Sequence, residues 1–111
     1  MPSSEPRGNV VKLKLNAARA QAQVRELAQD TGTIILTDHA RERMEQRGFV
    51  MRDLLRILRT GYVDDAPIGL REGDWQCKMT QQVGGREAGA VTIIVQAQQL
   101  VIRTVEWEDG R

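Results

Sequence analysis

The 111-residue sequence has only one cysteine and one histidine. Cys77 has no second cysteine with which to form an internal disulfide, which fits a reducing compartment. A structural zinc site needs about four cysteine or histidine ligands, so the sequence excludes one. No clustered acidic motif indicates another bound cation. We therefore expect a cytoplasmic protein that needs no metal and no other cofactor.

Long hydrophobic runs are also missing. No apolar stretch approaches the ~20 residues of a transmembrane helix, and the first eight residues are polar, unlike a secretory signal. A membrane partner is therefore not expected. With 41% apolar residues the chain can still bury a core, and its length suits one domain. We expect a flexible N-terminus over 1–12 and a single α+β domain over 13–111.

Neither sign of charge dominates, because the formal net charge is +1. Basic residues are nevertheless concentrated in two places, over 7–25 without any acidic residue and over 41–59 among several. A phosphate-binding face is compatible with this distribution, and so is ordinary solvated charge on amphipathic helices.

Helical patterns occupy the first half of the chain. Asn16 is a suitable N-cap for a helix that runs to about Gln29, with apolar residues at three- and four-residue steps. The next expected elements are a strand over 33–36, a helix over 39–47 and an amphipathic helix over 51–59.

The second half shows β patterns. Residues 75–82 alternate between apolar and polar side chains, and turn signals separate them from strands over 90–97 and 100–107. Residues 62–66 are expected at a sheet edge. The order αβααβββ predicts an α+β fold in which N-terminal helices pack on a small antiparallel sheet.

The candidate catalytic residues lie on the second expected helix. His39, Arg43 and Arg47 follow one another at four-residue spacing, so they lie along one side of that helix. Histidine is the residue type suited to proton transfer near neutral pH, and arginines bind phosphate oxygens through paired, charge-assisted hydrogen bonds. Together they predict metal-free RNA cleavage, with His39 as general acid/base. The alternative is that all three only tie the helix to the sheet, and Arg47 is the first expected to do so.

A second candidate surface is the polar side of the strand over 75–82. The predicted substrate-binding residues are Gln76, Lys78, Arg86 and Arg103. The alternative is ordinary exposure, because an antiparallel sheet normally turns one polar side to solvent. Cys77 shares the other side with Trp75 and Met79, so we expect a buried and unreactive thiol.

The run TDHARERMEQRGF (37–49), followed by DLLRILRTG (53–61), is similar to the signature of a widespread bacterial family of unknown function. That family has a His-Ala-x-x-Arg-Met-x-x-Arg-Gly helix, a second helix ending in Gly, and a β-meander. The match covers about 33–107. The family usually has Ser or Thr at the start of the second of these helices, where this chain has Val50-Met51, which weakens that start by ~1 kcal/mol.

The whole order also resembles the motility quorum-sensing regulator toxins of the RelE-like superfamily, small ribonucleases that cleave mRNA and are held inactive by an antitoxin. The segment KLKLNAARAQAQVRELAQDTGTIILTDHA resembles their opening, and their Trp-Gln pair falls on Trp75-Gln76. This resemblance implies RNA and an antitoxin protein as partners, with the oligomeric state open. Two departures stand out, because the toxins' active-site Tyr falls near Ala90 and their C-terminal basic residue among 106–109.

Two functions therefore compete. The first is a toxin-type, metal-independent ribonuclease, for which His39→Ala abolishes activity. The second is a non-catalytic RNA- or protein-binding module of the same fold. In that case arginine substitutions weaken binding and His39→Ala has no effect.

Overall fold

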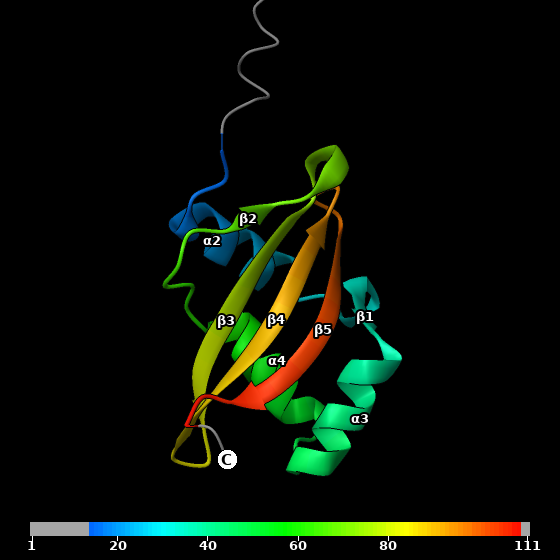
Figure 1. Cartoon of the computed structure of the whole chain (residues 1–111), viewed down its shortest axis with the longest axis vertical. Helices are drawn as coiled ribbons and strands as arrows, with labels where there is room; N and C mark the ends of the chain where they lie inside the picture. The colour runs from blue at the N-terminus through cyan, green and yellow to red at the C-terminus, as the bar shows by residue number, and fades with distance from the viewer. Residues whose placement is uncertain (1–13, 110–111) are drawn as a thin grey trace, which may run out of the picture.

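In the computed structural model, which describes residues 14–109, three helices pack on one face of a five-stranded sheet (Figure 1). The flexible N-terminus expected over 1–12 lies outside the described residues. The helices are α2 (Ala17–Leu27), α3 (Asp38–Arg47) and α4 (Met51–Thr60). The strands are β1 (Ile34–Leu36), β2 (Ile68–Gly69), β3 (Trp75–Val83), β4 (Arg86–Val95) and β5 (Gln99–Trp107). The predicted α+β class is confirmed.

The strand order in the sheet is β1-β5-β4-β3-β2. Strands β3, β4 and β5 form the antiparallel meander that the sequence predicts, but β1 pairs parallel with β5, so the sheet is mixed and not purely antiparallel. The parallel pair is possible because the chain leaves β1 through two helices before it returns to the sheet. Of the edge segment expected over 62–66, only Tyr62 pairs, in an isolated bridge with Thr80, and β2 follows Pro67.

The helices start where capping residues allow them to. Asn16 and Thr37 each accept a hydrogen bond from a backbone N–H in the first turn, in α2 and α3 respectively. At α4 the side chain of Val50 cannot do so, but Asp53 Oδ2 accepts the Val50 N–H at 2.9 Å, which supplies half of a capping box. Gly48 ends α3 with φ 78°, a left-handed conformation that glycine adopts without strain.

Two arginines join α2 and α4 by capping each other's helix. Arg25 of α2 donates to the carbonyls of Thr60 and Gly61 at the end of α4, and Arg59 of α4 donates to the Ala28 carbonyl at the end of α2. These guanidinium groups satisfy carbonyls that a helix leaves without a partner. Part of the basic character of 41–59 therefore serves the packing of the helices.

The core lies between the helices and the covered face of the sheet. Its largest fully buried aliphatic side chains are Val24, Leu54, Ile57, Leu58, Met79, Ile94, Leu100, Ile102 and Val105. Cys77 is buried with them, as predicted, and burial raises the pKa of its thiol to about 11. That thiol is therefore protonated and unreactive at neutral pH.

Candidate functional site

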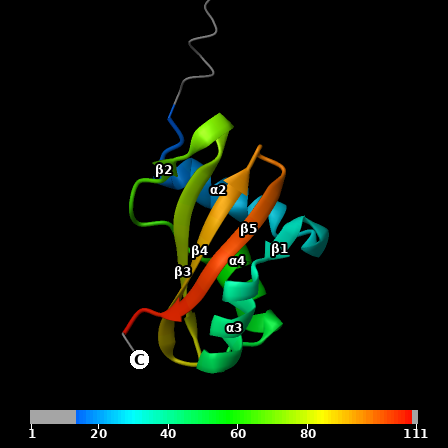
Figure 2. The same cartoon turned by 45° about the vertical axis from the view of Figure 1, so that its right-hand side comes forward.

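Because the helices lie on one face of the meander, β3, β4 and β5 present a second face that no described helix covers, here called the open face (Figures 1 and 2). Most of its polar side chains come from the two outer strands of the meander and from the residue after β5. They include Gln76, Lys78, Arg103, Thr104, Glu106 and Glu108. The middle strand contributes the small or apolar positions Gly89, Val91, Ile93 and Val95.

A β-bulge in β5 decides which residues reach the open face. Val91 pairs with Thr104 but Thr92 pairs with Ile102, so Arg103 is an extra residue in β5. The extra residue reverses the alternation of side chains after it, and Val105 therefore enters the core. Without the bulge, Glu106 would point into the core. Bulges often redirect side chains next to functional sites.

Arg103 and Gln76 meet across the middle strand, where Arg103 Nη1 donates to Gln76 Oε1 at 2.7 Å. Two residues predicted to bind substrate are thus brought together from β5 and β3. One hydrogen bond uses only one of the five N–H donors of a guanidinium group, so most of its capacity for phosphate oxygens is left.

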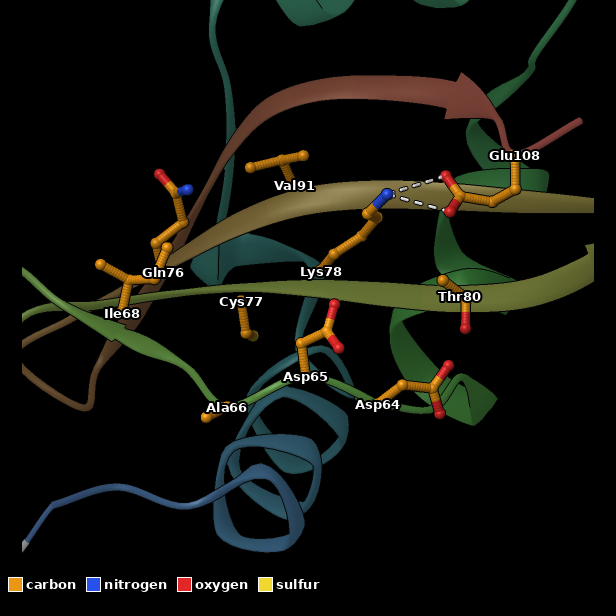
Figure 3. Close-up of a pocket in the computed structure, with 10 residues that line it drawn as sticks. All are labelled: Asp64, Asp65, Ala66, Ile68, Gln76, Cys77, Lys78, Thr80, Val91 and Glu108. Carbon is orange, nitrogen blue, oxygen red and sulfur yellow. Dashed lines mark hydrogen bonds and ion pairs between the residues drawn. The ribbon is translucent and has the colours of Figure 1, made fainter. Parts of the chain in front are cut away.

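Lys78 is held by two carboxylates on the same face. Its ammonium lies 3.3 Å from Glu106 Oε2 and 2.9 Å and 3.2 Å from the two oxygens of Glu108 (Figure 3). The hydrogen bond to Glu108 is the main reason why the pKa of Lys78 is raised, against desolvation, which lowers it. Lys78 is therefore charged but already paired, which weakens it as a direct phosphate ligand.

Gly89 lies directly beneath this ion pair. A Cβ at position 89 would lie 2.5 Å from Glu108 Oε2 and 2.9 Å from Lys78 Cδ, because both side chains cross β4 at that point. Glycine inside a strand costs roughly 0.5–1 kcal/mol relative to alanine, and an exposed ion pair contributes about 0–1 kcal/mol. The two contributions are of similar size and opposite sign.

A cavity of about 260 Å³ lies beside Lys78, between β3 and the loop that leads to β2 (Figure 3). Asp64 and Asp65 border it from the loop, and Glu108 from the other side. Three carboxylates and one ammonium group thus line the cavity. The cavity is net negative and unsuited to a phosphate, which places any phosphate contact nearer to Arg103.

Helix α3 packs along the edge of β5 that β1 leaves uncovered (Figure 2). Arg47 Nη1 donates to the Val105 carbonyl at 3.0 Å, and the Arg47 carbonyl accepts from Trp107 Nε1 at 3.0 Å. Arg47 therefore closes part of a sheet edge and acts as an anchor. This is the structural role that the sequence indicated first for Arg47.

His39 and Arg43 lie further round the same helix. From buried Ala40 and Met44, the helical wheel passes to Arg47 at the β5 edge and then to Arg43 and His39. His39 is exposed and makes no hydrogen bond or ion pair with another described residue, whereas Arg43 Nη1 donates to Gln46 at 2.7 Å. Their side chains therefore leave the β5 edge toward solvent.

Arg86 lies apart from the other predicted substrate-binding residues. It forms two hydrogen bonds to Asp109, and its guanidinium group stacks 4.1 Å from the ring of Trp107. Trp107 in turn stacks on Phe49. These contacts hold the end of the sheet, on the side that the helices cover.

Glu106, Glu108 and Gly89 are not among the site residues that the sequence predicts. The signal for the first two is a change of phase in the apolar pattern of β5. Leu100 and Ile102 are two residues apart, but the next buried residue, Val105, comes three residues later. Such a change indicates a bulge. Nothing in the sequence shows that Gly89 lies beneath an ion pair.

Within residues 14–109 there is no group of three or more histidine, cysteine, aspartate or glutamate side chains arranged to hold a metal ion. In the same range, no helix combines the length and apolar character needed to cross a membrane.

The fold and the open face define a small α+β domain with a mixed sheet and a charged, uncovered sheet surface. The chain belongs to the family described as Domain of unknown function (DUF4258), whose model matches residues 36–107. The expected membership of a family of unknown function is confirmed, and the matched range includes α3 and the whole meander. No curated protein and no solved structure matches the chain.

Proposed function

We propose that the protein is a toxin-type, metal-independent ribonuclease that an antitoxin-type partner protein holds inactive. The observation that carries this proposal is the Arg103–Gln76 pair, hydrogen-bonded at 2.7 Å on an open sheet face. Uncovered sheet faces are a common platform for single-stranded RNA. A guanidinium group fixed on such a face suits one phosphate of the chain.

Helix α3 supplies the rest of the proposed site. It begins against the backbone of Arg103, since Thr37 Oγ1 donates to the Arg103 carbonyl at 3.3 Å. His39 and Arg43 leave the helix on the side that continues from the β5 edge. In the proposed complex, Arg43 and Arg103 bind phosphate oxygens and stabilise the charge of the phosphorane, while His39 transfers a proton.

The test is cleavage of single-stranded RNA by the purified protein in the presence of EDTA. We expect 2′,3′-cyclic phosphate products, and a cleavage rate about 10²–10⁴-fold lower for His39→Ala, the range for loss of a general acid or base. Arg41→Ala is the matched control, because Arg41 is exposed on the opposite side of α3. Absence of RNA cleavage by the wild type, together with equal bacterial growth when wild type and His39→Ala are expressed, would refute the proposal.

One observation favours the second candidate, a non-catalytic RNA- or protein-binding module. His39 has no hydrogen-bond partner among the described residues, whereas a catalytic histidine usually has one that orients its ring. This alternative predicts that Arg103→Ala weakens RNA binding, measured by fluorescence anisotropy. His39→Ala would then bind RNA as the wild type does.

A further inference from the structure

The proposed reaction needs two proton transfers, one by a general base and one by a general acid, and His39 can perform only one of them in a single step. We propose that Glu106 is the second group, the general base that takes the proton from the 2′-hydroxyl of RNA. The proposal rests on the proposed function and adds a catalytic residue to the same open face. It also gives Lys78 a positioning role in place of a direct phosphate contact.

The backbone conformation of β5 places the Glu106 side chain on the open face. The bulge at Arg103 reverses the alternation of side chains, so Arg103 and Glu106 lie on the same face of the same strand, three residues apart. A phosphate held by Arg103 therefore has the Glu106 carboxylate as a neighbour along β5. The cluster around Lys78 lies on the other side of Glu106, across β4.

Two carboxylates contact the Lys78 ammonium, and Glu106 is the one that still has an oxygen available to accept a hydrogen bond from substrate. Both oxygens of Glu108 contact the Lys78 ammonium, and its side chain is 20% exposed. Glu106 makes one longer contact through Oε2, its Oε1 has no partner among the described residues, and its side chain is 34% exposed. Glu108 thus anchors Lys78, and Lys78 holds the Glu106 carboxylate in place.

The small size of Gly89 lets the side chains of Lys78 and Glu108 lie close over β4. The Lys78–Glu108 pair occupies the space that a Cβ at this position would need.

The reaction balances without a co-reactant. The Glu106 carboxylate accepts the 2′-O–H proton, and the 2′-oxygen forms a bond to phosphorus. The bond from phosphorus to the 5′-oxygen breaks, and that oxygen takes a proton from the His39 imidazolium. The products are a 2′,3′-cyclic phosphate and a free 5′-hydroxyl, and the proton passes from Glu106 back to His39 through water.

The experiment compares two substrates, a short single-stranded RNA and the same RNA with sulfur in place of the bridging 5′-oxygen at the cleaved bond. A thiolate leaves without being protonated, so the second substrate needs a general base but no general acid. We expect Glu106→Gln to lower the cleavage rate about 10²–10³-fold on both substrates. His39→Ala should be slow on the normal RNA and close to wild type on the sulfur-containing RNA.

Glu87→Gln is the matched control, because Glu87 is exposed on β4 and is not a hydrogen-bond or ion-pair partner of Lys78. It should leave both rates unchanged. Glu106→Asp keeps the carboxylate but shortens its reach, and a rate between wild type and Glu106→Gln supports the assignment even where the glutamine variant folds poorly. Affinity for an uncleavable 2′-deoxy strand should change less than about twofold in every Glu106 variant.

The outcomes separate this inference from the proposed function. If the wild type cleaves RNA and Glu106→Gln cleaves it equally fast, Glu106 is not the base and the proposed function stands. A defect of Glu106→Gln on the normal RNA alone also overturns the assignment, because it marks a general acid. If the wild type cleaves neither substrate, the proposed function fails, and this inference fails with it.

Discussion

Arg47→Ala separates an anchoring role from a catalytic role on α3. Arg47 Nη1 donates to the Val105 carbonyl at 3.0 Å, at the edge of β5 beyond the end of β1. Removal of the side chain leaves this partly buried carbonyl without its protein donor, which costs about 1–3 kcal/mol. For a domain of this size, each kcal/mol corresponds to a fall in Tm of about 4–8 °C.

The assay is thermal and urea unfolding, followed by tryptophan fluorescence. Trp107 stacks on Phe49 and donates to the Arg47 carbonyl, so its emission reports the docking of α3 on the sheet. We expect Arg47→Ala to lower Tm by at least about 4 °C with an unchanged urea m-value. RNA cleavage per folded molecule, measured well below Tm, should stay close to wild type.

Arg43→Ala is the matched comparison on the same helix. Its guanidinium group contacts only Gln46, one turn away, so the free energy of unfolding should change by less than about 0.5 kcal/mol. The reverse ranking, with a stable Arg47→Ala and an unstable Arg43→Ala, would show that the assignment of anchor and site is wrong.

Three further predictions concern stability and reactivity. Gly61→Ala should lower the free energy of unfolding by about 1–3 kcal/mol in urea titrations, because the new Cβ would collide with the backbone oxygens of Ile57 and Thr80. A positive change would contradict the close approach of α4 to β3. Ala97→Gly should raise the free energy of unfolding by about 0.5–1 kcal/mol, since Ala97 has φ of 57° in the β4–β5 turn and makes no side-chain hydrogen bond; a loss of stability would argue against that turn. Cys77 should resist iodoacetamide at pH 7 in the folded protein, and its rate should rise about tenfold per pH unit toward a pKa of about 11. Equal labelling of native and urea-unfolded protein at pH 7 would refute the burial of this thiol.

The sign of the Cys77 effect on stability follows from the same shift. The folded protein favours the protonated thiol, whose pKa rises from 9.0 to about 11. The contribution to stability is therefore fully present below pH 9 and is lost as the pH rises toward about 11.

Local chemistry made the helices and the meander predictable. Asn16 as a cap and Gly48 as a stop act within a few residues of their own position, and the alternation of 75–82 reflects one buried side. The parallel pairing of β1 with β5 was not predictable in this way. It joins two segments that are far apart in the sequence, and a three-residue apolar segment does not encode its distant partner.

In the candidate site, too, only the features that depend on local sequence were predictable. Residue type identified Arg103 and Gln76 as suitable for substrate, and their shared face follows from the alternation of each strand. Whether a lysine or arginine side chain remains available to bind phosphate depends on its contacts with residues that are distant in the sequence. Lys78 meets Glu106 and Glu108 about thirty positions away, and Arg86 meets Asp109, so neither pairing can be read from local spacing.

The pairing of Lys78 changes how RNA would lie on the open face. If Lys78 were an unpaired phosphate ligand, the backbone of the RNA would follow β3 toward the cavity. The carboxylates of Asp64, Asp65 and Glu108 around that cavity repel a phosphate instead. The positive charge still suited to phosphate lies at Arg103 and on α3, so the RNA backbone should cross β5 and turn its sugars toward Glu106. A 2′-hydroxyl directed at a carboxylate, with the phosphate held by arginine, is the orientation that the proposed reaction requires.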